Sequence, residues 1–323
     1  MARYLDDAHR HDIAQLHRTF TVRSEWPTWL LLIGFYASWA AVIFGAASLG
    51  KAASVAVLVP LLVLWMSLQH ECIHGHPTRS ARLNACLAYL PFALWYPYPL
   101  YRDSHLAHHN EHTLTVPGLD PESRYVTAQR WAEAGPFARW LLWANKTLAG
   151  RLMLGVFTSL AALLSDDILP ALKGRQGQQR VWLIHLLLVA VILYCVQRFS
   201  ALSALEYVGY VSLPALAITL IRSFSEHRPA TDPAHRTILN ESRGLLSCLF
   251  LHLNLHLVHH DLPRLPWYCL PGVYRARRLC WIARNDGYVV SGYTALLRRH
   301  FSRPIDSLDT PASSPSKPLA GKA

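Results

Sequence analysis

The chain has 323 residues, of which 52% are hydrophobic and only 16% charged, whereas soluble proteins carry about 25% charged residues. This composition excludes disordered and fibrous proteins and favours a protein that meets lipid. The net charge of +11 would also suit a nucleic-acid-binding protein, but the basic residues are spread over segments that flank apolar runs. We therefore expect no nucleic-acid partner.

The first 27 residues are polar, with apolar residues at helical spacing. This pattern predicts a cytoplasmic or interfacial helix. The first apolar run starts only after this segment and is longer than the hydrophobic region of a signal peptide. We therefore expect the segment to remain on the protein.

Two pairs of apolar runs predict four transmembrane helices. The runs are 28–49, 52–69, 181–196 and 201–221. Each is close to the roughly 20 residues that a helix needs to cross a bilayer, although the second pair contains His185, Glu206 and Pro214. Two hairpins would leave both termini and the segments after the second and fourth runs on one side. The positive-inside rule makes that side cytoplasmic.

The remaining segments complete an all-α integral membrane fold. Prolines break residues 83–101, which we expect to be interfacial or re-entrant. Residues 139–164 predict a helix along the membrane surface, with a fifth span as the alternative. Residues 222–302 supply the rest of a cytoplasmic helical cap that carries the metal site. The predicted organisation is an N-terminal segment 1–27, a membrane domain 28–302 and a disordered tail 303–323 rich in Pro and Ser.

Three short histidine clusters give the chemical signal. They are His70-Glu-Cys-Ile-His74, His105-Leu-Ala-His108-His109 and His256-Leu-Val-His259-His260. On a helix, residues at i, i+3 and i+4 share one face, so each cluster offers two or three imidazoles to a metal. All three follow the apolar runs on the predicted cytoplasmic side. His227, just after the fourth run, brings the set to nine, which with water suits a two-metal centre with an open position.

These three boxes, with His227 and four spans in two hairpins, resemble the membrane fatty acid desaturase family, which includes hydroxylases and carotenoid ketolases. The resemblance covers roughly residues 28–275 and includes Pro263 and Pro266 after the third box. Acyl-CoA members of that family have an asparagine one turn before the histidine that corresponds to His227, whereas this chain has Ser223.

The resemblance implies a non-haem di-iron centre that activates O2 to remove hydrogens from a fatty acyl chain. The implied ligands are His70, His74, His105, His108, His109, His227, His256, His259 and His260. No further catalytic or cofactor-binding residue is assigned. We expect an oxidoreductase of lipid metabolism that introduces a C=C bond, a fatty acid desaturase. The same centre could instead hydroxylate or ketolate the chain, or decarboxylate a free fatty acid to a terminal alkene.

The sequence also bears on partners. It has no fused cytochrome-like domain, no flavin fingerprint and no paired CxxC motifs, so electrons must come from a separate ferredoxin-, rubredoxin- or cytochrome b5-like protein. The acyl tail should occupy an apolar tunnel, with its head near Arg102, Arg124, Lys146 or Arg264. We expect the active site on the cytoplasmic side of a membrane, most simply the bacterial inner membrane.

Rival functions explain fewer residues. His70-Glu71 to His74 also fits the HExxH motif of a membrane zinc protease, but that reading leaves both HxxHH clusters without a role. A metal carrier should have polar residues throughout its spans, where this chain has only His185 and Glu206. Polar residues beside the boxes are candidates for orienting the ligands. They are Glu71, His76, Asp103, Asn110, Glu111 and His112. Residues 120–124 form a turn that either faces the substrate or lies on the surface.

Overall fold

The computed structural model describes residues 2–45, 49–174 and 177–306. Helices make up 65% of the described residues. The described residues contain only two short strands, β1 (Leu239–Asn240) and β2 (Val289–Val290), which pair in parallel. The predicted helical fold class is therefore confirmed. The predicted tail lies outside the described residues from position 307 onward.

Among the described residues, five helical segments are long and apolar enough to cross a membrane. They are α3 (Trp26–Phe44), α4 (Lys51–Ile73), the segment 155–172, α12 (Gln179–Phe199) and the segment 204–222. Two of them contain a π-helical turn. The first comprises α10 (Gly155–Ala162), η2 (Leu163–Ile168) and α11 (Leu169–Leu172), and the second comprises α13 (Ala204–Glu206), η3 (Tyr207–Ser212) and α14 (Leu213–Arg222). Four of the five coincide with the predicted spans. The fifth, 155–172, overlaps the region for which both a surface helix and a span were considered.

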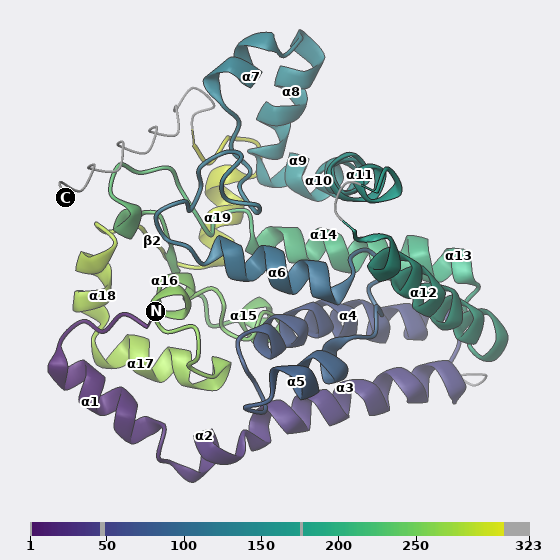
Figure 1. Cartoon of the computed structure of the whole chain (residues 1–323), viewed down its shortest axis with the longest axis horizontal. Helices are drawn as coiled ribbons and strands as arrows, with labels where there is room; N and C mark the ends of the chain where they lie inside the picture. The colour runs from purple at the N-terminus through teal and green to yellow at the C-terminus, as the bar shows by residue number, and fades with distance from the viewer. Residues whose placement is uncertain (1, 46–48, 175–176, 307–323) are drawn as a thin grey trace.

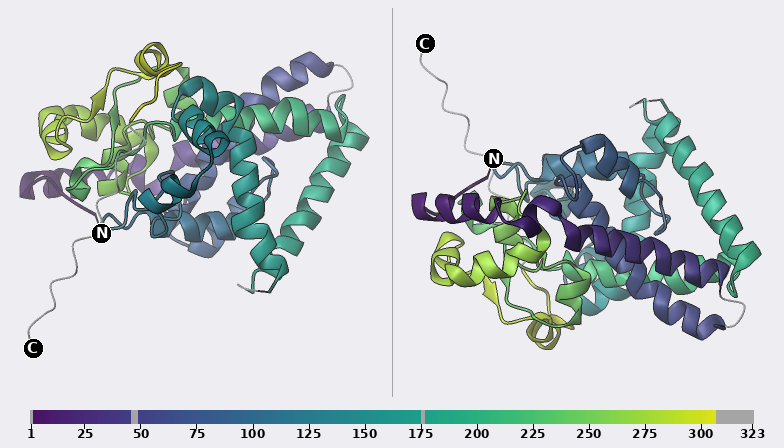
Figure 2. Two further views of the ribbon diagram at one scale, coloured as in Figure 1. Left: turned by 90° about the horizontal axis from the view of Figure 1, so that it is seen from above. Right: turned by 90° about the horizontal axis from the view of Figure 1, so that it is seen from below.

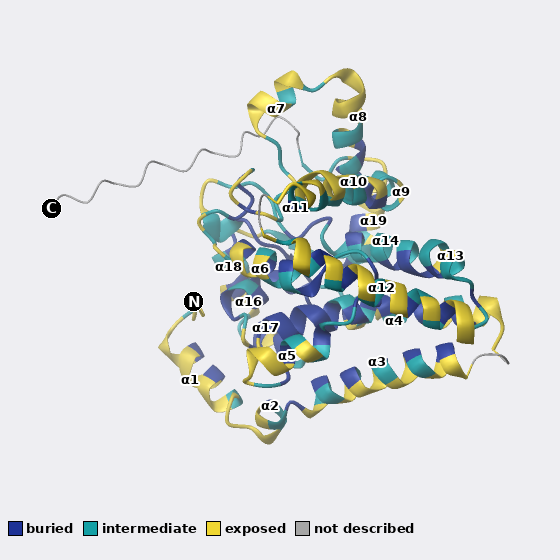
Figure 3. Cartoon of the chain, turned by 45° about the vertical axis from the view of Figure 1, so that its right-hand side comes forward, coloured by how far each residue is buried: buried dark blue, intermediate teal, exposed yellow. Residues whose placement is uncertain are grey.

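Helix α4 lies at the centre of the apolar helices and packs against α3, η3 and α14. In Figure 1, α3, α4 and α14 run side by side in one direction, whereas α10 and α11 run across it, as the left view of Figure 2 shows. Trp65 of α4 is fully buried and stacks on Phe35 of α3, with ring centroids 4.4 Å apart. Burial colours in Figure 3 show the outward faces of α3 and α12 exposed, as expected for helices that face lipid.

The proline-rich stretch 89–97 follows α5 (Ala81–Ala88) and passes between the apolar helices without regular structure. Side chains from the helices satisfy its carbonyl groups. The Tyr207 hydroxyl donates to the Phe92 carbonyl at 3.0 Å, the Ser212 hydroxyl donates to the Ala93 carbonyl at 2.6 Å, and His185 Nε2 lies 2.9 Å from the Leu94 carbonyl. Because protein covers this irregular backbone and pairs its carbonyl groups, the stretch can lie among the apolar helices. His185, the histidine within a predicted span, has a structural role.

The other helices gather at one end of the apolar helices (Figure 1). They are α1 (Asp7–Leu16), α2 (Phe20–Ser24), α6 (Tyr98–His108), α7 (Ala128–Glu133), α8 (Pro136–Asn145), α9 (Leu148–Met153), α15 (Leu245–Leu249), α16 (His256–Asp261), α17 (Leu270–Ala276), α18 (Arg278–Arg284) and α19 (Tyr293–His300), with 3-10 turns η4 (Pro233–His235) and η5 (Trp267–Cys269). Ion pairs of Arg277 with Asp6 and Asp12, at 3.0 and 2.7 Å, hold α1 against the other helices of this layer. The layer carries the second and third histidine clusters.

Candidate metal centre

The first histidine cluster ends α4. His70 lies in the last turn and His74 caps the helix, with the His74 N–H donating to the His70 carbonyl at 3.3 Å. Because the two residues are one turn apart, their imidazoles share a face, with ring centroids 4.7 Å apart. Just beyond, His76 Nδ1 lies 2.7 Å from Glu25 Oε1, and this buried contact holds the start of α3 against the cluster.

The second cluster ends α6. The helix begins after Pro97 and has Pro99 in its first turn, where a proline costs no helical hydrogen bond. His105 and His108 lie in the last turn, and His109 caps the helix. Because the helix stops here, its three imidazoles reach in two directions. His105 and His109 face the first cluster, and His108 faces His227.

The third cluster forms the short helix α16. Leu251 and His252, upstream of it, have left-handed φ angles of 49° and 58°, which turn the chain before the helix starts. The Leu257 N–H donates to the Ile238 carbonyl beside β1 at 3.1 Å. This contact fixes α16 in the protein interior, where His256 and His259 are almost completely buried.

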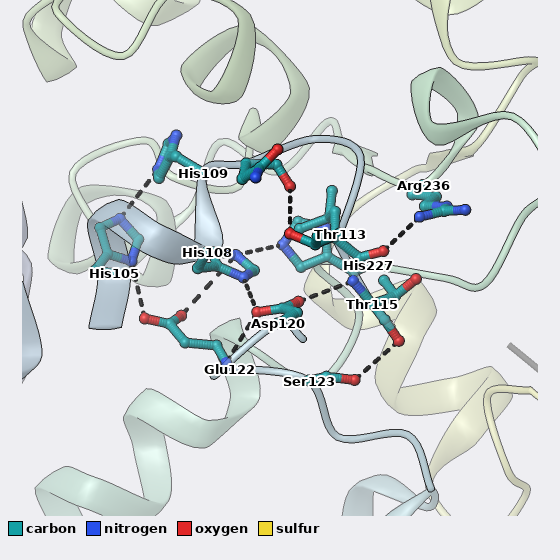
Figure 4. Close-up of polar contacts among 12 residues, drawn as sticks. His105, His108, His109, Thr113, Thr115, Asp120, Glu122, Ser123, His227 and Arg236 are labelled. Carbon is teal, nitrogen blue, oxygen red and sulfur yellow. Dashed lines mark hydrogen bonds and ion pairs between the residues drawn. The ribbon is translucent and has the colours of Figure 1, made fainter. Parts of the chain in front are cut away.

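His227 comes into place through a short hairpin after α14. It forms an antiparallel bridge with Thr237, and the Arg228 N–H donates to the Arg236 carbonyl at 2.9 Å. The hairpin directs the His227 imidazole at His108, whose Nε2 lies 3.0 Å from His227 Nε2 (Figure 4).

All nine histidines singled out in the sequence come together, in two adjacent groups. The first group is His70, His74, His105, His109 and His259, and the second is His108, His227, His256 and His260. Within each group the nitrogen atoms available to a metal lie within 4.8 Å of one another. The groups touch where the rings of His109 and His260 stack at 4.1 Å.

The geometry of each group suits a metal ion. Neighbouring Nε2 atoms face one another at 3.0 to 3.2 Å, as between His105 and His74 or His259 and His109. That spacing matches nitrogen ligands about 2 Å from a common ion. Both ring nitrogens of His70 are buried without a hydrogen-bond partner among the described residues, a costly state that metal ligation relieves. The two groups can therefore hold a pair of metal ions.

Carboxylates contact the other ring nitrogen of several histidines (Figure 4). Asp120 Oδ1 lies 2.9 Å from His108 Nδ1, and Glu122 Oε1 lies 3.1 Å from His105 Nδ1. The backbone N–H groups of Thr115 and Glu122 donate to Asp120 at 2.8 and 2.9 Å and hold its carboxylate still. Such contacts fix which nitrogen is free to bind metal and how the ring is oriented.

Burial and neighbouring histidines lower the pKa of six cluster members outside the apolar helices well below the ordinary value. These are His74, His109, His227, His256, His259 and His260. Their imidazoles are neutral at pH 7, the form that binds metal. Burial opposes protonation of His108 too, but the hydrogen bond to Asp120 and the charge of Glu122 outweigh it and raise the pKa of His108.

Most of the residues beside the boxes contact side chains other than the clustered histidines. Glu71 Oε2 accepts the Trp267 N–H at 3.2 Å and lies 3.8 Å from His70 Nδ1 through its other oxygen. Asp103 pairs with Arg102. Glu111 pairs with Arg3 and Arg284, His76 contacts Glu25, and His112 is exposed. The contacts in Figure 4 come instead from residues 120–124, the turn whose role the sequence left open.

Ser223, four residues before His227, has a backbone partner at the end of α14. Its hydroxyl donates to the Leu220 carbonyl at 3.4 Å.

A cavity of about 990 Å³ adjoins the second group. His108, His227 and Glu122 line one part of it, and apolar side chains such as Met66 and Leu216 line another. Of the four cations considered from the sequence, Arg124 and Lys146 line this cavity, whereas Arg102 and Arg264 do not.

Comparison with known proteins adds one finding. Residues 50–288, well over half of the chain, match the family model described as fatty acid desaturase. The match contains all nine histidines of the two groups. No curated protein matches the sequence.

Proposed function

The chain belongs to the fatty acid desaturase family, and from this premise we propose that it is an O2-dependent di-iron oxidoreductase that introduces a C=C bond into a fatty acyl chain. The observation that carries the proposal is the pair of histidine groups beside a large, partly apolar cavity. Two irons held by the nine histidines would supply the oxidising chemistry that removes hydrogens from an unactivated chain.

The protein's own residues would hold and orient both partners of the reaction. Asp120 contacts His108 Nδ1 and Glu122 contacts His105 Nδ1, and these contacts would orient the two rings. The apolar wall of the cavity would align the acyl chain and keep water from it. Hydroxylation and oxidative decarboxylation need the same residues, so the product alone separates these outcomes from desaturation.

The zinc protease alternative has less support. Its general base would be Glu71, the glutamate of the HExxH motif. The Glu71 side chain is 2% exposed and accepts the Trp267 N–H. It does not contribute to the described lining of the cavity beside the metal groups. A base in that position has no access to the water and peptide that it would have to activate.

The histidines also constrain the path through the membrane. His74 follows α4 and His227 follows α14, yet both lie in the same centre. The chain between them must cross an even number of times, although three of the apolar segments lie there. We infer that α12 and 204–222 cross, while 155–172, which runs across the other helices and carries Asp166 and Asp167, lies along the surface (Figure 2). This gives four spans in two hairpins with a cytoplasmic cap.

Cysteine labelling tests this path. In variants with a single cysteine in an otherwise cysteine-free chain, an impermeant maleimide should label Ala201→Cys in intact cells. It should reach Lys173→Cys and the native Cys280 only after the cells are permeabilised, because we place these positions on the cytoplasmic side. Labelling of Lys173→Cys in intact cells would mean that 155–172 crosses the membrane and would overturn the inferred path.

The activity itself is tested with purified protein, a reduced ferredoxin and its reductase, and fatty acyl substrates. We expect a product that is lighter by two hydrogens, that forms only with O2, and that disappears when the metal is removed by chelation. The electron donor is external in our proposal, so omitting the ferredoxin should also stop product formation. An iron-loaded protein that consumes no O2 with any acyl substrate would contradict the proposal.

A further inference from the structure

The cavity beside the metal centre reaches only one of the two histidine groups. His108 and His227 of the second group line it, whereas no histidine of the first group contributes to its described lining. The second group also has four histidines where the first has five. A metal ion in the second group would therefore have one nitrogen donor fewer, and the cavity is the side from which another donor can approach it.

Glu122 is a cavity carboxylate that lies between the two groups (Figure 4). Its Oε1 lies 3.1 Å from His105 Nδ1 in the first group. His105 Nε2 faces His74 Nε2 at 3.0 Å, so this contact is on the side of the ring that points away from the first metal position. The other oxygen, Oε2, lies 4.0 Å from His108 Nε2 in the second group.

The contact with His108 is on the opposite side of its ring. His108 Nδ1 is already bonded to Asp120 at 2.9 Å, and its Nε2 faces His227 Nε2 at 3.0 Å. His108 Nε2 is therefore the nitrogen that points at the second metal position. Oε2 of Glu122 consequently lies beside the place that the second metal would occupy.

Other carboxylates near the grouped histidines approach the rings differently. Among the described residues, those within 4.0 Å of a ring nitrogen all contact Nδ1. They are Glu71 at 3.8 Å from His70, Asp120 at 2.9 Å from His108 and Glu226 at 3.6 Å from His256. Glu122 is thus distinguished by its approach to an Nε2 atom.

The spacing suits two donors of one ion. Donor atoms that bind an ion from opposite sides, each about 2 Å from it, lie about 4 Å apart. Glu122 Oε2 and His108 Nε2 are 4.0 Å apart. Glu122 is not among the donors that all lie within 4.8 Å of one another, so Oε2 must move towards the other histidines when metal binds. The side chain is 32% exposed and has its one hydrogen bond to the described residues through Oε1, so Oε2 is free to move.

We propose that Glu122 is an oxygen ligand of the second metal and gives that metal its fifth protein donor. Four neutral imidazoles bring no negative charge, whereas a carboxylate offsets part of the charge of an iron ion, and iron in proteins accepts mixed histidine and carboxylate ligands. The inference rests on the proposed function, because it requires two irons. It makes them unequal, with five nitrogen donors in the first group and four nitrogens and one oxygen in the second.

Glu122→Gln tests this assignment in the iron-loaded, detergent-purified protein without any turnover. The glutamine amide oxygen can still accept from His105 Nδ1, but the variant lacks the anionic oxygen that would bind the metal. A chelator should remove one iron per chain at a concentration at least about tenfold lower than in the parent protein. The Mössbauer spectrum of the retained iron should match that of His108→Ala, which loses a ligand of the second metal. It should differ from that of His259→Ala, which loses a ligand of the first.

Glu133→Gln is the matched control, since Glu133 is exposed on α7, contacts Gln129 and does not contribute to the described cavity lining. This variant should keep both irons up to the same chelator concentration as the parent protein. Glu122→Gln that holds both irons as firmly as the parent would overturn the assignment. So would a retained iron that matches that of His259→Ala, because Glu122 would then act only on the first metal through His105. Either result leaves the di-iron function standing, which a parent protein without iron would contradict.

Discussion

Replacing His259 by alanine should abolish turnover and lower the iron content of the purified protein from about two ions per chain to about one. His259 belongs to the first group, is 1% exposed, and its Nε2 lies 3.2 Å from that of His109. Removal of a direct ligand opens the metal site. The loss of activity should therefore exceed the roughly 10- to 100-fold loss that is typical when a residue hydrogen-bonded to a ligand is replaced. Iron analysis and product formation measure the two effects.

His112→Ala is the control for this substitution. His112 lies three residues after the second box but is exposed and belongs to neither group. Its replacement should leave iron content and product formation unchanged. If His259→Ala kept both irons and full activity, the assignment of the first group as a metal site would be wrong.

Asp120→Asn should weaken iron binding in the second group and reduce activity by about 10- to 100-fold. The carboxylate of Asp120 accepts from His108 Nδ1 at 2.9 Å and from the Thr115 N–H at 2.8 Å. An asparagine has one oxygen and one NH2 group in place of two acceptors, so one of these donors loses its partner. His108 would then no longer hold a fixed orientation and tautomer toward the second metal.

Asp7→Asn, in the exposed pair with Arg10 and outside the described cavity lining, serves as the comparison and should behave like the parent protein. Titration with a chelator, followed by spectroscopy of the remaining iron, should show that Asp120→Asn loses one of two irons more readily than the other. Equal loss of both irons, or none, would contradict a role for Asp120 in holding His108.

The apolar helices and the helical setting of the histidine clusters could be predicted from local pattern. The apolar run 52–69 and the following box correspond to one helix, α4, with His70 and His74 on one face of its end. The second and third boxes likewise lie at or in helices, α6 and α16, because spacings of three and four residues match the helical repeat.

How the nine histidines divide between the two groups could not be predicted. His108 and His109 are neighbours in the sequence, but His109 joins the first group and His108 the second. The division depends on where α6 ends and on the hairpin that brings His227 against His108. Both are set by tertiary contacts, such as the bridge to Thr237, that leave no periodic signal in the sequence.

The carboxylates that contact His105 and His108 could not be assigned from the sequence either. Polar residues next to the boxes, such as Glu71 and Asp103, were natural candidates. Asp103 pairs with Arg102, and Glu71 accepts the Trp267 N–H through one oxygen while the other lies 3.8 Å from His70 Nδ1. Asp120 and Glu122 lie 12 and 17 residues beyond the histidines that they contact, because the chain folds back over the end of α6. The path of an irregular loop is not encoded in a local spacing.

Metal analysis of the detergent-purified protein, grown with added iron, is the decisive experiment for the proposed di-iron centre. We expect about two irons per chain, held by the nine histidines and lost in part when His259 or His108 is replaced. A single zinc per chain, with no iron bound after iron-supplemented growth, would contradict a di-iron centre and with it the proposed oxidative function.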